Sequence, residues 1–383
     1  MDKPTVQDIF HRFYPAYLDQ YSPSPVQAKV AHNIMNCKTG AYGANVCVCE
    51  DCGFVQIHYN SCRNRCCPMC QAVPKEMWMD ARREDVLDAP YFHLVFTVPD
   101  ILNPVIYSNQ RLLYDALYHA ASSTISELTA DPKHLGANVG YICILHTWGS
   151  EMNFHPHIHT ILLGGGLASN NQWKDNGENF FLPIRVISKM FRGKYLEELK
   201  RLWEEDKLVF HGTAEKFRNH YTFKELLDSC YGMDWIPHCK KTFNGAQTVI
   251  KYLGKYTHRI AVSNHRIVRM DDDTVTFLVK DYRNEGQWKE LTISGVEFVR
   301  RFLMHVPPRR FVRIRHYGLL CSRTKSQKLT LCRNLLGCKK YLSKLRDMEM
   351  PEILEHLYGI KVCVCKACGG HLGKPQMRMP LRC

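Results

Sequence analysis

Apolar residues recur every three to four positions in some stretches of this chain and alternate with polar residues in others. The first pattern predicts amphipathic helices and the second predicts strands with one buried face, so we expect an α+β fold. The helical stretches are 6–21, 25–36, 74–88, 103–129, 188–206, 222–230, 295–304, 325–344 and 351–358. The predicted strands are 91–98, 139–148, 154–163, 260–267, 274–280 and 288–293, and the glycines 164–166 end the third of them.

The second and third predicted strands are close enough in sequence to pair as a hairpin, and the third carries alternating histidines. Alternate residues of a strand face the same side, so His157 and His159 point together. Two imidazoles on one strand face are half of a metal site. His146 on the neighbouring strand, or His155 on the same strand, can supply a third ligand. The alternative is that these histidines are ordinary polar residues on a sheet face.

Composition and charge narrow the class of protein. The chain has 383 residues, enough for two or three domains, and its 45% of apolar residues excludes a disordered protein. The net charge of +14 and the pI near 9.0 favour a polyanionic partner, and nucleic acid is the first candidate. The alternative is a basic surface that only keeps the protein in solution.

The sequence also predicts where the protein works. No apolar run approaches the roughly 18 residues of a membrane span, so we expect no membrane partner. Residues 1–5 lack the charged and then apolar order of a signal peptide. We therefore expect a cytoplasmic protein, in which disulfide bonds are rare.

Eighteen cysteines in a reducing compartment indicate metal binding rather than a disulfide framework. Two Cys-x2-Cys pairs can each supply two thiolates to a tetrahedral Zn²⁺, and the gap between them suits one zinc ribbon; they are Cys49 with Cys52 and Cys67 with Cys70. A second candidate ligand set, in which Cys47 can replace one member, consists of His32, Cys37, Cys62 and Cys66. Near the end of the chain Cys363, Cys365 and Cys368 form half of a knuckle, and the candidates for completing it are Cys338, His371 and Cys383.

Basic residues cluster in two segments that suit contact with DNA. Arg63 and Arg65 lie between the two cysteine pairs, where guanidinium groups can bind phosphates; the alternative is a solvated loop. Residues 307–318 interleave aromatic residues with arginines, which is the composition of a groove for a single strand. The arginines of that segment are Arg309, Arg310, Arg313 and Arg315.

The stretch 245–259 combines a helical apolar stripe with two tyrosines. Tyr252 and Tyr256 are four residues apart and share a helix face, beside Lys251 and Lys255, which have the same spacing. A glycine at 254 costs a helix about 1 kcal/mol relative to alanine, so we expect a close approach of backbone or DNA there. The alternative is that the tyrosines only pack against the core.

Histidine metal ligands together with helical tyrosines predict a phosphoryl-transfer reaction. A divalent cation, Mg²⁺ or Mn²⁺, polarises the scissile phosphate and stabilises the charge that develops on it. A tyrosine hydroxyl attacks and leaves a phosphotyrosine and a free 3′-hydroxyl, with Lys255 or Lys251 stabilising a phenolate whose pKa is normally near 10. The ester conserves the bond energy, and no G-x4-G-K-[ST] motif occurs in the chain, which excludes an ATP-driven helicase or ATPase.

Five motifs give the chain a resemblance to a known family. They span residues 59–71, 145–149, 155–166, 252–259 and 313–319, and include His-Pro-His-Ile-His and Tyr-Leu-Gly-Lys-Tyr-Thr-His-Arg. In this order they resemble the rolling-circle transposases of bacterial insertion sequences, the HUH two-tyrosine family of the IS ninety-one type. The resemblance implies His157 and His159 as metal ligands, Tyr252 and Tyr256 as nucleophiles, and a central antiparallel sheet crossed by the tyrosine helix. Cys66 stands where family members often carry histidine, which changes the ligand type rather than the zinc site.

We therefore expect three parts: a helical, zinc-binding and DNA-binding domain over 1–73, an HUH nuclease domain over 74–310, and a basic, mainly helical region over 311–383. The resemblance implies a nucleoid-associated transposase that nicks and rejoins single-stranded DNA at insertion-sequence ends, with structural Zn²⁺ and catalytic Mg²⁺ or Mn²⁺. Lys251 and Arg259 are further expected DNA contacts. The alternatives are a plasmid replication initiator or relaxase with the same chemistry, and a zinc-ribbon regulator that binds nucleic acid without any enzymatic activity.

Overall fold

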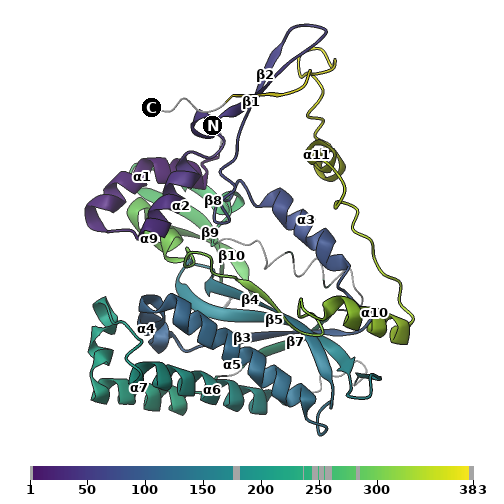
Figure 1. The fold of residues 1–383 in the computed structure, drawn as a ribbon. Helices are drawn as coiled ribbons and strands as arrows, with labels where there is room; N and C mark the ends of the chain where they lie inside the picture. Colours follow the sequence, from purple (N-terminus) through teal and green to yellow (C-terminus); the bar gives the residue numbers. More distant parts are fainter. Residues whose placement is uncertain are drawn as a thin grey trace.

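The computed structural model describes residues 3–175, 182–235, 237–243, 249, 254, 261–281 and 285–378. Within these ranges three antiparallel sheets are present, and helices cover both faces of the largest sheet (Figure 1). The expected α+β class is confirmed. None of the described helices combines the length and the apolarity that crossing a bilayer requires.

The central sheet has the strand order β11-β4-β5-β3-β7, and a short strand, β6, pairs with the far end of β5. The middle positions belong to the predicted hairpin, so the alternating histidines lie in the interior of the sheet rather than at an edge. The strands are β3 (Tyr91–Thr97), β4 (Asn138–Trp148), β5 (Phe154–Leu167), β6 (Trp173–Asp175), β7 (His238–Phe243) and β11 (Ile314–Gly318).

The three glycines 164–166 do not end strand β5, which continues to Leu167, so this prediction is wrong. They stand where neighbouring chain leaves no room for a side chain. A Cβ atom at Gly164 would collide with the ring of Phe92, and one at Gly165 would collide with Trp173. A Cβ atom at Gly166 would collide with the backbone of Asn138. The glycines therefore allow strands to approach closely, which outweighs the usual cost of glycine in a strand.

One face of the central sheet is covered by a layer of helices that lies below it in Figure 1. The expected helix 103–129 is broken at Asn109, whose side chain accepts a hydrogen bond from the backbone of Val209 (2.8 Å) and donates one to the Val209 carbonyl (2.7 Å). This side chain ties the helix break to a distant loop. The helices are α4 (Asn103–Ser108), α5 (Gln110–Ala130), α6 (Ile184–Glu204) and α7 (His220–Gly232).

The opposite face of the sheet packs against α3 (Ala72–Arg83) and α10 (Lys325–Leu336). The expected basic helix 325–344 is shorter than predicted, because Gly337 adopts a left-handed φ of 65° and ends it. The following residues turn back to α3, where the buried Asp80 accepts hydrogen bonds from Tyr341 (2.7 Å) and Ser343 (2.5 Å).

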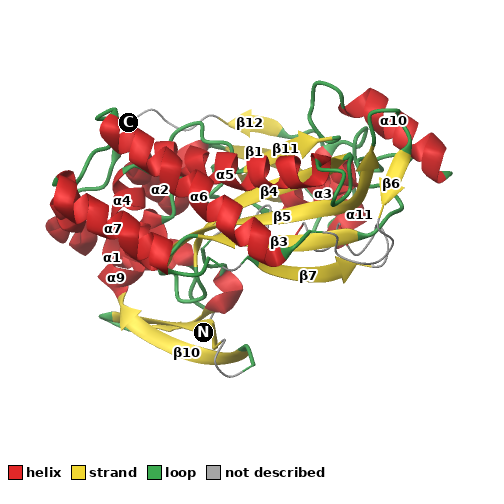
Figure 2. Ribbon diagram, turned by 90° about the horizontal axis from the view of Figure 1, so that it is seen from below, coloured by secondary structure: helices red, strands yellow, loops and turns green. Residues whose placement is uncertain are grey.

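A second core lies beside the central sheet and combines the N-terminal helices with the last part of the expected nuclease region. Helices α1 (Val6–Gln20), α2 (Pro25–Met35) and α9 (Gly295–Met304) pack there against a separate sheet, β10-β9-β8. Figure 2 shows β10 on the side of α1 and α9. The strands of this sheet are β8 (Ile267–Met270), β9 (Thr274–Asp281) and β10 (Gln287–Ser294).

The predicted strand 260–267 is wrong over its described residues, which contain a 3-10 turn, Asn264–Arg266, and reach β8 only at Ile267. The reason is a contact with the N-terminal helix. The side-chain oxygen of Asn264 accepts a hydrogen bond from the first backbone N–H of α1, at Val6 (3.1 Å). The N-terminal helices and residues 261–304 therefore share one core, across the expected boundary at residue 73.

The third sheet brings the two ends of the chain together (Figure 1). Its strands are β1 (Ala44–Val48), β2 (Val55–Tyr59) and β12 (Gln376–Arg378), and β12 pairs with β1. The backbone of Gly373 donates a hydrogen bond to the Val48 carbonyl (2.9 Å) next to this pairing. Helix α11 (Met350–Tyr358) lies on the path from α10 to this sheet.

Candidate active site and metal centres

Three histidines converge on one face of the β4–β5 hairpin. His157 and His159 alternate along β5, and His146 stands directly opposite His157 on β4. One ring nitrogen of each lies within 4.8 Å of the others, and all three side chains are largely buried. Three imidazoles at this spacing fit a divalent transition metal or a cation with open positions for a substrate. The structure thus brings the expected pair together with His146.

Hydrogen bonds orient two of these rings toward a common point. His157 donates from Nδ1 to the carbonyl oxygen of His155 (2.7 Å), and the Nε2 atoms of His157 and His159 are 3.1 Å apart. His159 Nδ1 shares a hydrogen bond of 2.9 Å with Nε2 of His93, a buried residue of β3. Such outer partners fix ring orientation in metal sites. Sequence reasoning missed His93, although its position in an alternating strand was a usable signal.

His155, the other candidate for the third position, lies outside this cluster. Its Nδ1 is 3.2 Å from the carboxylate of Asp100, and its side chain is 37% exposed. His155 therefore pairs with an acidic partner and is not a member of the cluster, although the centroid of its ring lies 5.2 Å from that of His157.

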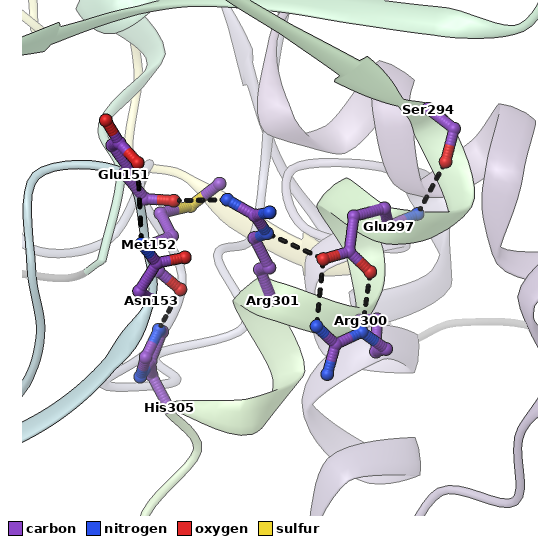
Figure 3. A network of polar contacts seen from close by, with 8 residues as sticks. All are labelled: Glu151, Met152, Asn153, Ser294, Glu297, Arg300, Arg301 and His305. Atoms are coloured by element: carbon purple, nitrogen blue, oxygen red, sulfur yellow. Dashed lines mark hydrogen bonds and ion pairs between the residues drawn. The ribbon is translucent and has the colours of Figure 1, made fainter. Parts of the chain in front are cut away.

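The turn between β4 and β5 is held in place by α9, as Figure 3 shows. Arg301 donates a hydrogen bond to the carbonyl of Glu151 (2.9 Å), and His305 donates one from Nε2 to the carbonyl of Met152 (3.0 Å). The other ring nitrogen of His305 is 3.2 Å from the hydroxyl of Thr147, next to His146 in the sequence. Helix α9 therefore fixes the hairpin that carries the histidines.

Two groups of this network have displaced pKa values. Arg300 and Arg301 hydrogen-bond the carboxylate of Glu297 and lower its pKa to about 2. Burial lowers the pKa of His305 to about 4, so this ring is neutral at physiological pH. A neutral ring is consistent with its contacts, because it offers one donor to Met152 and one acceptor to Thr147.

The predicted nucleophiles Tyr252 and Tyr256 lie outside the described residues, as do Lys251, Lys255 and Arg259. Two described residues flank Tyr252. Val249 is buried in the core on the face of the sheet that also carries Ile161, which shares the orientation of His159. A Cβ atom on Gly254 would collide with the sulfur of Met79 on α3. The close approach expected at this glycine is therefore one of protein against protein.

The cysteines form two clusters, and the predicted pairing of Cys49 and Cys52 with Cys67 and Cys70 is wrong. The first cluster joins Cys67 and Cys70 to two members of the expected second set, Cys37 and Cys62. The other members are elsewhere: His32 Nδ1 is 3.2 Å from the side chain of Asn36, and Cys66 is buried beside Arg65 and Arg313. Spacing alone could not reveal this set, because all its ligands come from loops and helix ends.

The second cluster joins Cys49 and Cys52 to Cys365 and Cys368 from the C-terminal segment. Cys363, Cys338 and His371 are not in it, and Cys383 lies outside the described residues. The sequence did contain a signal that was missed. Cys52 and Cys368, which end the two pairs of this cluster, are each followed directly by a glycine. Both glycines have a left-handed φ, 71° at Gly53 and 78° at Gly369. The pair at 67–70 is followed by glutamine.

Both clusters fit zinc by their chemistry. Four thiolates about 2.3 Å from a tetrahedral ion lie about 3.8 Å apart. The sulfur of Cys70 is 3.4 Å from that of Cys37 and 3.6 Å from that of Cys62. Hydrogen bonds from Cys62 and Cys67 lower the pKa of Cys70 to about 2, and the Cys368 backbone N–H lowers the pKa of Cys365 to about 7. Both shifts are toward the thiolate, the form that binds metal.

Four of the predicted DNA-contacting arginines line one groove of about 1290 Å³: Arg63, Arg65, Arg310 and Arg313. Arg65 also donates to the carbonyls of Phe311 (2.6 Å) and Pro308 (3.3 Å), which holds residues 307–318 against the first cysteine cluster. Arg309 is exposed beside this region and lines a smaller neighbouring pocket. Arg315 instead pairs with Asp115 on α5, and its guanidinium stacks over Tyr118.

Comparison with known proteins gives a consistent result. The family model described as "Transposase zinc-binding domain" matches residues 9–98, and the model described as "Putative transposase" matches residues 140–328. The chain is 40% identical over 369 residues to the "Putative transposase y4qJ" of Sinorhizobium fredii (strain NBRC 101917 / NGR234), covering 95% of this chain and 93% of that protein. It is 30% identical over 309 residues to the "Transposase for insertion sequence element IS801" of Pseudomonas savastanoi pv. phaseolicola, covering 79% and 72%. A solved structure of the conjugative relaxase TrwC in complex with OriT DNA matches 29% of this chain and 44% of that one, at 16% identity and a TM-score of 0.24.

Proposed function

The chain belongs to the insertion-sequence transposases of the IS ninety-one type, which have an N-terminal zinc-binding domain, and we propose that it nicks and rejoins single-stranded DNA through a phosphotyrosine. The observation that carries the proposal is the cluster of His146, His157 and His159. Val249 and Gly254, which flank Tyr252 in the sequence, lie on the same side of the sheet as this cluster. This shared side of the sheet supports a reaction in which the histidine cluster and Tyr252 act on the same phosphate.

The three histidines would hold a divalent cation, which would polarise the scissile phosphate and stabilise the charge that develops on it. His93 and the carbonyl of His155 keep two of the rings turned toward the same point, and α9 keeps the hairpin in place. This preorganisation matters because a misplaced ligand costs both metal affinity and rate.

Tyr252 or Tyr256 would supply the nucleophile. The phenolic oxygen forms a bond to phosphorus while the bond from phosphorus to the 3′-oxygen breaks, and the departing oxygen takes up a proton. The phenol loses its own proton to solvent, with Lys255 or Lys251 stabilising the phenolate. Attack of a 3′-hydroxyl on the phosphotyrosine reverses these steps and joins a new strand. Two tyrosines allow two such transfers in one site.

The groove lined by Arg63, Arg65, Arg310 and Arg313 would hold the strand. Its walls combine guanidinium groups with the exposed ring of Tyr358, and this combination suits a backbone that carries phosphates and bases that stack. The basic net charge of the chain supports the same kind of partner.

The test is incubation of the protein with single-stranded oligonucleotides that carry the ends of its element, with Mg²⁺ or Mn²⁺, followed by a denaturing gel. We expect a covalent protein–DNA adduct and a shortened strand with a free 3′-hydroxyl. The adduct should disappear in the double variant Tyr252→Phe, Tyr256→Phe. Absence of any adduct with every end sequence would favour a regulator that only binds nucleic acid.

A further inference from the structure

We propose that Cys49, Cys52, Cys365 and Cys368 bind one Zn²⁺, and that this ion is a clasp that closes a C-terminal strap over the basic groove. The strap is defined as residues 347–362, between the segment that docks on α3 and the second cysteine cluster. The family model for zinc binding ends at residue 98, so it does not include the C-terminal pair of ligands.

The geometry of the cluster matches a tetrahedral thiolate site. The sulfur of Cys49 is 3.5 Å from that of Cys368, and the sulfur of Cys52 is 3.8 Å from that of Cys365, close to the spacing of about 3.8 Å expected around zinc. The backbone N–H of Ala367 donates to the Cys365 sulfur (3.4 Å). The two matching Cys-x2-Cys-Gly turns approach the same point from the two ends of the chain.

Packing alone is a weak explanation for why the C-terminal segment stays on the β1–β2 hairpin. The buried core at this junction consists of Cys47, Cys49, Cys365 and Leu372. Four side chains, three of them cysteines, bury too little apolar surface to offset the ordering of a long tail. A metal bond contributes folding free energy directly, and structural zinc sites do this in domains with small cores.

The near end of the strap is fixed on α3. Asp80 accepts hydrogen bonds from Tyr341, from Ser343 and from the backbone of Leu345 (3.0 Å), and Glu84 pairs with Arg346 (2.6 Å). Burial raises the pKa of Asp80, but hydrogen bonds from Ser343, Tyr341 and the backbones of Leu345 and Lys344 outweigh it and lower this pKa, so Asp80 is charged at neutral pH. The strap is therefore held at one end by carboxylates and at the other end by the cysteine cluster.

Between these two anchors the strap forms one wall of the basic groove. Met350, Leu354 and Tyr358 of α11 line the same groove as Arg63 and Arg310. The described lining contains basic side chains and no carboxylate. A strand in this groove would be enclosed by the strap, so the clasp would slow its release; this consequence rests on the proposed function.

The first test counts zinc and measures hydrogen exchange on the full-length protein. In the double variant Cys365→Ser, Cys368→Ser we expect one zinc per chain by plasma mass spectrometry, against two in the unchanged protein. The rate of backbone amide hydrogen exchange in residues 371–378 should rise at least tenfold. The reason is that β12 no longer pairs with β1, and Gly373 no longer donates its hydrogen bond to Val48. Exchange in β3, β4 and β5 should stay the same, which separates release of the tail from global unfolding.

The matched control is Cys363→Ser, an exposed cysteine two residues before the cluster and outside it. It should keep two zinc ions and the slow exchange of residues 371–378. Two zinc ions in the double variant, or the same loss in the control, would overturn the clasp.

The second test measures the release of a fluorescent single-stranded oligonucleotide after dilution into unlabelled competitor. The double variant should release it about tenfold faster, while Cys363→Ser should not. If the double variant loses one zinc but releases the oligonucleotide at an unchanged rate, closure of the groove is wrong and only the zinc site is supported. Failure of the unchanged protein to form a covalent adduct would count against the proposed reaction, and the zinc count is independent of that result.

Discussion

The histidine cluster and the second cysteine cluster are both built from side chains that can hold a metal, but they differ in how the chain assembles them. His146, His157 and His159 belong to one hairpin, so strand pairing alone brings them together. Cys49 and Cys368 are 319 residues apart and meet only after both ends of the chain are in place. A site of the first kind can exist before its metal arrives, whereas a site of the second kind is completed by folding and metal binding together.

This difference predicts how the two kinds of centre respond to chelation. Brief treatment with EDTA should abolish adduct formation, because an open imidazole site exchanges its ion with solvent. The zinc content and the far-ultraviolet circular dichroism should not change during the same treatment, since four thiolates enclose each zinc. Addition of Mn²⁺ should restore activity. If EDTA removed zinc as fast as it abolished activity, the histidine site and the cysteine clusters would not differ in metal exchange.

Removal of one histidine ligand should have the next largest effect. His157→Ala should lower the rate of adduct formation by about 1000-fold, since a bound cation contributes several kcal/mol to such a transition state. His155→Ala is the matched control on the same strand, because His155 pairs with Asp100 and is not one of the three ligands. The rate of adduct formation in His155→Ala should stay within about threefold of that of the unchanged protein. Equal losses in both variants would contradict the assignment of the cluster.

A smaller effect is expected at His93, which touches His159 and not the metal position. His93→Ala should weaken the apparent affinity for Mn²⁺ by about 10- to 100-fold, as loss of an outer partner does in other metal sites. Activity at saturating Mn²⁺ should recover most of the way. A loss that no Mn²⁺ concentration corrects would indicate a purely structural role for His93.

The smallest predicted effect concerns pH and α9. The folded pKa of His305 is about 4, below its usual value of 6.5, so between these values the unfolded chain binds a proton that the folded chain does not. The free energy of unfolding should therefore fall as the pH is lowered from 6.5 toward 4, by about 2 kcal/mol at pH 5. Urea titrations at pH 7 and pH 5 should show a smaller decrease in His305→Gln. An equal decrease in both proteins would exclude His305 as a source.

Local pattern predicted the histidine hairpin well, because alternation and short sequence separation determine it. The start of α1 was also predictable, since Thr5 and Asp8 form a capping box there. The break at Asn109 and the turn at Asn264 were not, because each depends on a partner about 100 or 258 residues away. The end of α10 at Gly337 was readable from the glycine itself.

The cysteine sets show where spacing misleads. Two Cys-x2-Cys pairs that are neighbours in sequence were expected to share one ion, yet each takes its partners from elsewhere. Sequence separation carries no information about such pairing when the ligands lie in loops. The glycine that follows Cys52 and Cys368 was the feature that related the correct pairs. The predicted division at residues 73 and 310 stays a prediction, although shared cores cross the first boundary.

The central claim is that Tyr252 or Tyr256 becomes joined to DNA in a reaction that depends on the histidine cluster. The most direct measurement is mass spectrometry of the protease-digested adduct formed with an element end. We expect the modified peptide to contain Tyr252 or Tyr256 and the modification to be absent in His157→Ala. A DNA-linked peptide from any other part of the chain would contradict it.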